Sequence, residues 1–181
     1  EILSGLVGSE MCIRDRTGSE VSIANYNCPG QIVISGQEEA VHLAGETCKA
    51  SGAKRVVPLK VSGPFHSKML QGAGEKLKEE LKKVEISDSF VPYIANVTAD
   101  YVTKKAEVKP LLASQVSSSV RWQQTIERLL ADGADEFVEI GPGRTLSGFV
   151  KKVNRDVKVS SIDKMEDFIQ FIGSHVEAGA C

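Results

Sequence analysis

Several features are missing from this chain of 181 residues, and each absence excludes a class of protein. No run approaches the roughly 18 to 20 consecutive apolar residues of a membrane-spanning helix, and no basic flank with an apolar run marks a signal peptide. An excess of basic residues is absent too, because 22 Lys and Arg stand against 24 Asp and Glu. The sequence therefore predicts neither a membrane protein nor a nucleic-acid-binding protein.

The cysteines lack the spacing of a disulfide framework or of a zinc site. They are far apart and form no C-x-x-C pair: Cys12, Cys28, Cys48 and Cys181. Reduced thiols in an intracellular protein are the favoured interpretation, and no metal site is predicted. Because 41% of the residues are hydrophobic and 25% are charged, we expect a globular cytoplasmic protein of mixed α/β class.

The segment from about 20 to 60 has the pattern of a small α+β unit. Alternation predicts a strand at 21–26, which a turn joins to a second strand at 31–34. Ser35 and Glu38 have the spacing of a capping box, which predicts a helix that runs to about Ser51. A short apolar run at 56–59 predicts a third strand.

The rest of the chain alternates between strand and helix patterns. Strands are predicted at 92–97, 137–140 and 157–162, and helices at 70–84, 108–117, 122–132, 146–153 and 164–177. Such alternation is typical of a parallel sheet covered by helices.

His66 is the best catalytic candidate among the three histidines. It follows a Gly-Pro turn and precedes a helical pattern, whereas His42 has charged neighbours and His175 lies near the C-terminus. Helix N-terminal amides disfavour a charged imidazolium, so they favour the neutral ring that a general base requires. Position alone leaves a capping or structural role for His66 open.

The loop Gly141-Pro142-Gly143 joins a predicted strand to a predicted helix. Backbone N–H groups in such a loop can bind an anion. However, Leu146 occupies the third glycine position of a dinucleotide fingerprint, and no Gly-Lys-Ser/Thr follows. A tight turn is therefore favoured over phosphate binding.

Three amide side chains have a weaker signal. Asn25 and Asn27 lie two residues apart and share one face if the strand persists, where they bind a ligand or, more often, cap a turn. Gln115 is a polar residue in an apolar helix and by itself indicates no function.

Four segments carry a family resemblance: Asn25–Gly36 (NYNCPGQIVISG), Ser51–Arg55 (SGAKR), Gly63–Ser67 (GPFHS) and Val138–Gly143 (VEIGPG). In this order they resemble the C-terminal half of the malonyl-CoA:acyl-carrier-protein transacylase family. The resemblance implies an α/β fold in two parts. Residues 17–61 would form part of a ferredoxin-like small subdomain, and residues 62–181 the C-terminal part of an α/β-hydrolase-like large subdomain with a mostly parallel sheet.

The resemblance also implies a reaction of fatty-acid biosynthesis. Malonyl passes from CoA to a serine, and then to the phosphopantetheine thiol of acyl carrier protein. His66 falls on the general base of the family, and Gln115 on the residue whose main-chain carbonyl orients that base. The proton is then on Nδ1, and Nε2 is free.

Substrate contacts follow from the same resemblance. Asn25 and Asn27 match positions that line the acyl and CoA pocket. Phe65 resembles malonyl-selective members, although Pro64 departs from the commoner alanine. The implied partners are malonyl-CoA and acyl carrier protein, with no bound cofactor, and the parent protein is expected to be a monomer.

The nucleophile of the family lies in a Gly-His-Ser-x-Gly motif, and no Gly-x-Ser-x-Gly occurs in this chain. We therefore expect a fragment that is inactive by itself. Residues 1–16 do not resemble the family, and 6–16 resemble translated sequencing-adapter DNA, which predicts a sequencing or assembly artefact. The alternatives are a non-catalytic half-domain that binds CoA or the carrier, and an acyltransferase module of a polyketide synthase.

Overall fold

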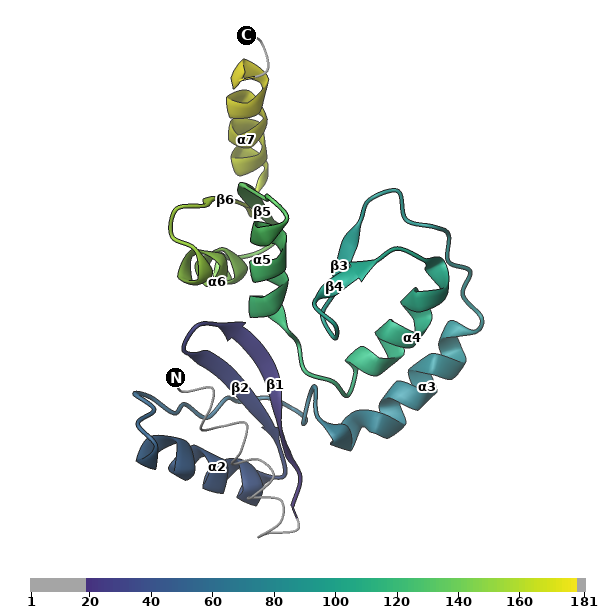
Figure 1. Cartoon of the computed structure of the whole chain (residues 1–181), viewed down its shortest axis with the longest axis vertical. Coiled ribbons are helices and arrows are strands. Elements are labelled where there is room, and N and C mark those ends of the chain that lie inside the picture. Colours follow the sequence, from purple (N-terminus) through teal and green to yellow (C-terminus); the bar gives the residue numbers. More distant parts are fainter. Residues whose placement is uncertain (1–18, 179–181) are drawn as a thin grey trace. The chain divides into compact units, whose positions relative to one another are not determined.

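Two compact units make up the chain, Glu1–Thr125 and Ile126–Cys181. The computed structural model describes residues 19–178 of them (Figure 1). The segment 1–16, which the sequence pattern sets apart from the family, lies outside the described residues. The mixed α/β class predicted from the sequence is confirmed.

The first unit begins with the predicted hairpin. Strand β1 (Val21–Cys28) pairs antiparallel with β2 (Gln31–Gly36). The turn between them needs a glycine, because Gly30 has a φ of 77°, a backbone conformation that costs glycine little. The register shifts twice along β1, between Ile23 and Asn25 and again between Tyr26 and Cys28.

Helix α2 (Glu38–Ala50) packs on this hairpin through a small apolar core of Val21, Ala40 and Ala44. The predicted capping box is wrong: Gln37 is the N-cap residue, and it makes no side-chain cap hydrogen bond. Ser35 cannot cap the helix because it still belongs to β2, paired with Ser22.

The predicted strand at 56–59 is also wrong, because residues 53–62 form neither strand nor helix. Val57 and Leu59 are 51% and 59% exposed. A short apolar run becomes a strand only where a neighbour pairs with it, and no described strand does so here.

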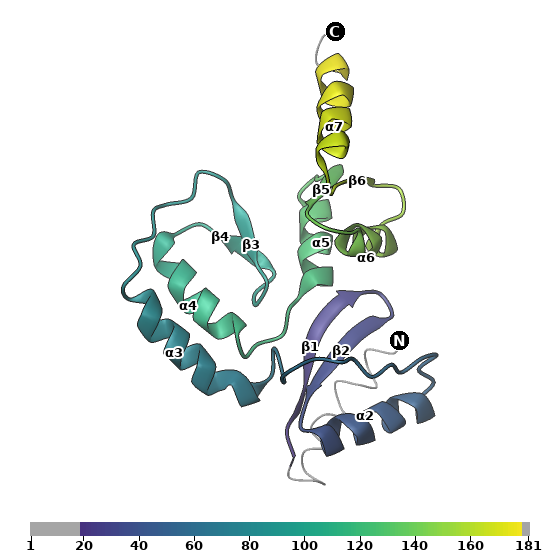
Figure 2. The same ribbon diagram turned by 180° about the vertical axis from the view of Figure 1, so that it is seen from behind.

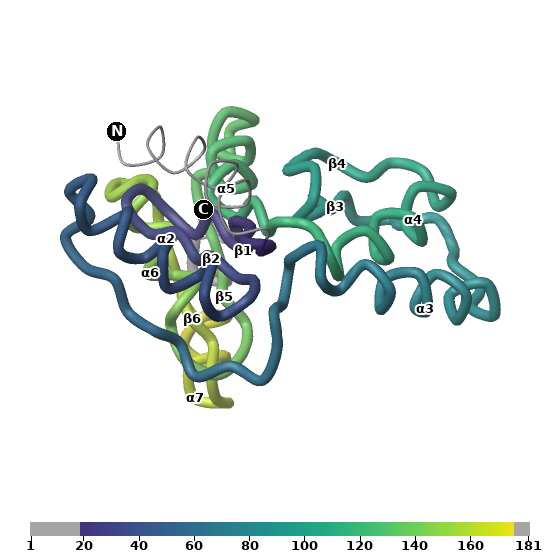
Figure 3. Tube along the Cα trace, turned by 90° about the horizontal axis from the view of Figure 1, so that it is seen from below, coloured from purple at the N-terminus to yellow at the C-terminus, as the bar shows by residue number. Residues whose placement is uncertain are grey.

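A helical hairpin completes the first unit. A short 3-10 helix, η1 (Lys68–Leu70), leads into α3 (Gln71–Leu81), and α4 (Lys105–Gln115) lies beside α3 (Figures 1 and 3). In the segment of chain that connects α3 to α4, β3 (Tyr93–Ala95) pairs antiparallel with β4 (Asp100–Val102). The sequence pattern missed β4 and wrongly assigned its neighbour to a parallel sheet.

Helix α5 (Trp122–Ala131) starts in the first unit and continues into the second. In the second unit, β5 (Glu136–Ile140) and β6 (Lys158–Ile162) form a parallel pair connected by α6 (Thr145–Val153), as Figure 2 shows from behind.

The last helix of this unit is α7 (Met165–Ala178). Among residues 19–178, β5 and β6 are the only two strands that pair in parallel, so the expected mostly parallel sheet is reduced to one pair. None of the described helices is long and apolar enough to cross a membrane.

Candidate active site

His66 lies in a tight turn with an unusual backbone. Its φ is 57°, in the left-handed region that few residues other than glycine adopt. Such conformations persist only where the surroundings hold them, and they cluster at functional sites. The sequence placed His66 at a helix entrance, but gave no sign of this conformation.

A buried hydroxyl holds the turn closed. Ser67 is fully buried, and its Oγ donates a hydrogen bond to the carbonyl oxygen of Pro64 at 2.7 Å. Inside this bridge, the N–H of Phe65 donates to Gly63 at 2.9 Å. The sequence motif contained Ser67 but assigned it no role. Its position three residues after a turn-forming proline is the signal that could have revealed it.

His66 meets Gln115, as the family pattern requires. Nδ1 of His66 lies 3.0 Å from the main-chain oxygen of Gln115, although 49 residues separate them. Gln115 is the last residue of α4, where helix carbonyls have no partner further along the helix. Because a carbonyl only accepts, Nδ1 must carry the proton. In the neutral ring Nε2 is then unprotonated, the state that a general base needs.

A pocket of about 420 Å³ opens beside His66. Its wall includes Tyr26 of β1, Lys68 of η1, and the loop 117–119 with Arg121. Strand and loop are held together by the backbone, because the N–H of Tyr26 donates to Val120 at 2.9 Å. The lining therefore combines two cations, a histidine and several serines with one acid, Glu20.

The residues predicted to contact the substrate do not line this pocket. Asn25 and Asn27 are half-buried on β1, and neither lines this pocket; Tyr26, between them, does. Phe65 is 52% exposed and also lies outside the lining. Asn25 and Tyr26 form consecutive pairs with Val33 and Ile32, so strand alternation places their side chains on opposite faces of β1.

The glycine loop of the second unit forms a turn, in agreement with the favoured interpretation. Gly141 and Gly143 have φ values of 142° and 88°. The N–H groups of Leu146 and Ser147 at the start of α6 donate to the carboxylate of Glu139, at 3.1 and 2.8 Å. These two helix donors are thus already occupied by an anion from the chain itself.

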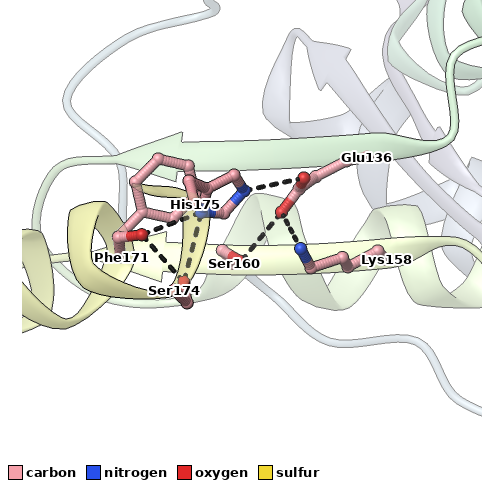
Figure 4. Close-up of polar contacts among 6 residues, drawn as sticks. All are labelled: Glu136, Lys158, Ser160, Phe171, Ser174 and His175. Carbon is pink, nitrogen blue, oxygen red and sulfur yellow. Dashed lines mark hydrogen bonds and ion pairs between the residues drawn. The ribbon is translucent and has the colours of Figure 1, made fainter. Parts of the chain in front are cut away.

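A second histidine stands in a network of charges in the second unit (Figure 4). Nε2 of His175 lies 3.0 Å from Glu136, and its Nδ1 lies 2.8 Å from the carbonyl of Phe171. Lys158 and Ser160 bind the other oxygen of Glu136, at 3.0 and 3.4 Å.

This network shifts two pKa values. The Glu136 carboxylate, and after it the Phe171 carbonyl, raise the pKa of His175 above its usual value. Hydrogen bonds from His175 and then Lys158 lower the pKa of Glu136. Because both ring nitrogens of His175 face acceptors, the geometry favours the protonated ring, which cannot act as a base. We therefore assign the candidate site to His66.

Known proteins show which family this chain resembles. The family model of the acyl transferase domain matches residues 4–166. The malonyl CoA-acyl carrier protein transacylase of Bacillus subtilis (strain 168) is 52% identical over 149 residues, which are 82% of this chain and 47% of that protein. The match to the family model begins inside the segment 1–16, so the boundary drawn there stays a prediction.

Solved structures give the same result. The MCAT of Streptococcus pneumoniae matches with a TM-score of 0.88 and 36% identity, over 94% of this chain and 55% of that one. A malonyl-transacylase solved in complex with its type II PKS acyl-carrier protein matches with a TM-score of 0.88 and 33% identity, over 92% and 53%. The chain thus spans about half the length of the relatives that it matches. With nine-tenths of its residues matched by the family model, the chain belongs to the acyl transferase domain family.

Proposed function

We propose that this chain supplies the general-base half of a malonyl-CoA:acyl-carrier-protein transacylase. The observation that carries the proposal is the contact between Nδ1 of His66 and the main-chain oxygen of Gln115, in a chain of the acyl transferase domain family. This contact leaves Nε2 as the basic atom, and no described residue forms a hydrogen bond with it. The proposed reaction moves malonyl from CoA to the phosphopantetheine thiol of acyl carrier protein.

Nε2 of His66 would act as a base once in each half of this reaction. It first accepts the proton of a serine hydroxyl while the serine oxygen attacks the malonyl thioester. The C–S bond breaks, and the departing CoA sulfur takes that proton. Nε2 then accepts the proton of the carrier thiol, whose sulfur attacks the malonyl-serine ester, and the serine regains a proton. The carbonyl of Gln115 stabilises the imidazolium that forms each time.

The serine must come from outside these 181 residues, since the chain contains no Gly-x-Ser-x-Gly. We assign it to the part of the relatives that this chain does not span. The chain alone is then expected to catalyse no transfer, because the covalent intermediate cannot form.

Substrate recognition is proposed from the family pattern. Asn25 and Asn27 would contact the acyl and CoA groups, and Phe65 would favour malonyl. Residues 17–61 would belong to the ferredoxin-like small subdomain and residues 62–181 to the large one. The remaining expectations are a cytoplasmic, monomeric parent that uses acyl carrier protein and malonyl-CoA without a bound cofactor.

A non-catalytic half-domain that binds CoA or the carrier is the second candidate. The absence of the nucleophile motif favours it, because binding needs no serine. The two proposals differ in what happens when the serine is restored.

Restoring the missing half provides the test. The N-terminal half of the Bacillus subtilis relative is fused in front of residues 20–181, and both this fused protein and the unmodified chain are incubated with labelled malonyl-CoA and holo carrier protein. We expect the fused protein to label the carrier and the unmodified chain to label none. Labelling by the unmodified chain would contradict the proposal. A folded fused protein that binds CoA in calorimetry without transferring malonyl would favour the second candidate.

A further inference from the structure

Helices α3 and α4 touch at one glycine. Gly74 is the only buried residue of α3, and Ala113 is the only buried residue of α4. A Cβ atom on Gly74 would lie 2.9 Å from the carbonyl oxygen of Ala113, closer than real Cβ atoms approach. The two backbones are therefore so close here that a side chain at position 74 would force one of them to shift.

This contact lies close to the ends of the helices that carry the site. Gly74 is in the first turn of α3, which follows the His66 turn through η1. Ala113 is in the last turn of α4, two residues before Gln115. The Gly74–Ala113 contact is therefore close in sequence to both groups of the His66–Gln115 pair.

The helix gains nothing local from this glycine. Glycine lowers helix stability relative to alanine, so a glycine inside a helix calls for a packing reason. Gly72 in the same helix has no such reason, because it is exposed and a Cβ there would meet nothing within 4 Å. The two glycines therefore form a matched pair, one inside the helix contact and one outside it.

We propose that Gly74 is a positioning residue that keeps the Gln115 carbonyl within hydrogen-bond distance of His66 and so keeps the ring proton on Nδ1. The proposal rests on the proposed function, in which Nε2 must be free to accept a proton. A side chain at Gly74 would push α4 away and weaken the contact that selects this tautomer. The proton would then be shared with Nε2, and a protonated Nε2 cannot act as a base.

The test compares Gly74→Ala with Gly72→Ala in the full chain. Nitrogen-15 NMR of the imidazole ring measures the ratio of the two neutral tautomers of His66 at alkaline pH. We expect Gly74→Ala to lower the ratio of Nδ1–H to Nε2–H by about two- to tenfold, the weight of one hydrogen bond. Gly72→Ala should leave the ratio unchanged.

Circular dichroism first establishes whether Gly74→Ala keeps its helix content, and so which variant is used for the NMR measurement. If Gly74→Ala alone loses helix content, the ratio is measured in the double variant Gly72→Ala/Gly74→Ala, where the second alanine favours the helix. An unchanged ratio in a folded variant that carries Gly74→Ala overturns the proposal. This readout needs no malonyl transfer, so it is independent of whether the proposed reaction takes place.

Discussion

Two histidines of this chain make the same first contact and differ in the second. Nδ1 of His66 and Nδ1 of His175 each face a main-chain carbonyl, at 3.0 and 2.8 Å. Nε2 of His175 also faces the carboxylate of Glu136 at 3.0 Å, whereas Nε2 of His66 has no hydrogen-bond partner within residues 19–178. The second contact favours the protonated form of His175, and His66 has no such contact within the described residues.

A hydrogen bond from Nδ1 to a carbonyl oxygen does not by itself make a histidine a general base. The carbonyl favours a proton on Nδ1 in both cases, and the partner of Nε2 then decides between a charged structural group and a proton acceptor. The two carbonyls also differ in origin. Phe171 is one helical turn from His175, but Gln115 is 49 residues from His66, so only the second contact depends on tertiary packing.

The largest expected difference between the two histidines is in transfer rate. In the fused protein with the restored serine, His66→Ala should slow malonyl transfer by about 10² to 10⁴-fold, the usual weight of a general base. His175→Ala should change the rate by less than about twofold, since Nε2 of His175 is bound to Glu136 and accepts no proton in the proposed reaction. Steady-state transfer of labelled malonyl measures both, and equal losses would abolish the distinction between the two histidines.

The serines next to the two histidines, Ser67 and Ser174, should contribute differently to the stability of the fold. Ser67 is buried and bonds to Pro64, so Ser67→Ala should lower the free energy of unfolding by about 1 to 2 kcal/mol, because it leaves a carbonyl without its donor. Ser174 makes an exposed bond to Phe171, and Ser174→Ala should cost less than about 0.5 kcal/mol. Urea unfolding of the full chain measures both values. A Ser67→Ala variant as stable as the wild type would show that the His66 turn does not need this hydroxyl.

The smallest expected effect is the pH dependence of the contact between His175 and Glu136. The pKa of His175 is raised from 6.5, so its contribution is complete below pH 6.5 and is lost as the pH rises through the higher folded value. The pKa of Glu136 is lowered from 4.5, so its contribution is present above pH 4.5 and is lost as the pH falls through the lower folded value. Lys158 opposes protonation of His175 by its charge.

Thermal melting across this range measures the effect. The melting temperature of the wild-type chain should exceed that of His175→Gln, which lacks the titrating ring, by more near pH 5.5 than near pH 8.5. His42→Gln is the matched control, because His42 is exposed and its nearest carboxylate oxygen, on Glu46, is 3.9 Å away. A pH dependence that persists unchanged in His175→Gln would assign it to another group.

The local sequence pattern predicted most of the helices and strands but not which strands pair. The periodic segments at 122–132 and 164–177 appear as α5 and α7, because an amphipathic period marks a helix wherever it packs. The apolar run at 56–59 failed as a strand, and β4 was missed, because pairing depends on a neighbour that three or four residues cannot specify.

The site divides in the same way. Motif order identified His66 and Gln115 as a pair, and their contact is present. The left-handed backbone of His66 and the close approach at Gly74 carried no signal in the residues alone, and Ser67 had only its spacing from Pro64 as a signal. Each depends on atoms brought together from separate segments or on the conformation of a single turn.

The sequence by itself determined the family, the α/β class and the identity of the two groups that meet, because these are properties of residue order. It contains no Gly-x-Ser-x-Gly motif, and for this reason the proposed nucleophile is assigned to the part of the relatives that the chain does not span. Only the tertiary structure decided which histidine has no hydrogen-bond partner on Nε2 among residues 19–178, and which carbonyl orients its ring. A hydrogen bond over 49 residues and a helix contact at one glycine exist only once α3 and α4 have packed.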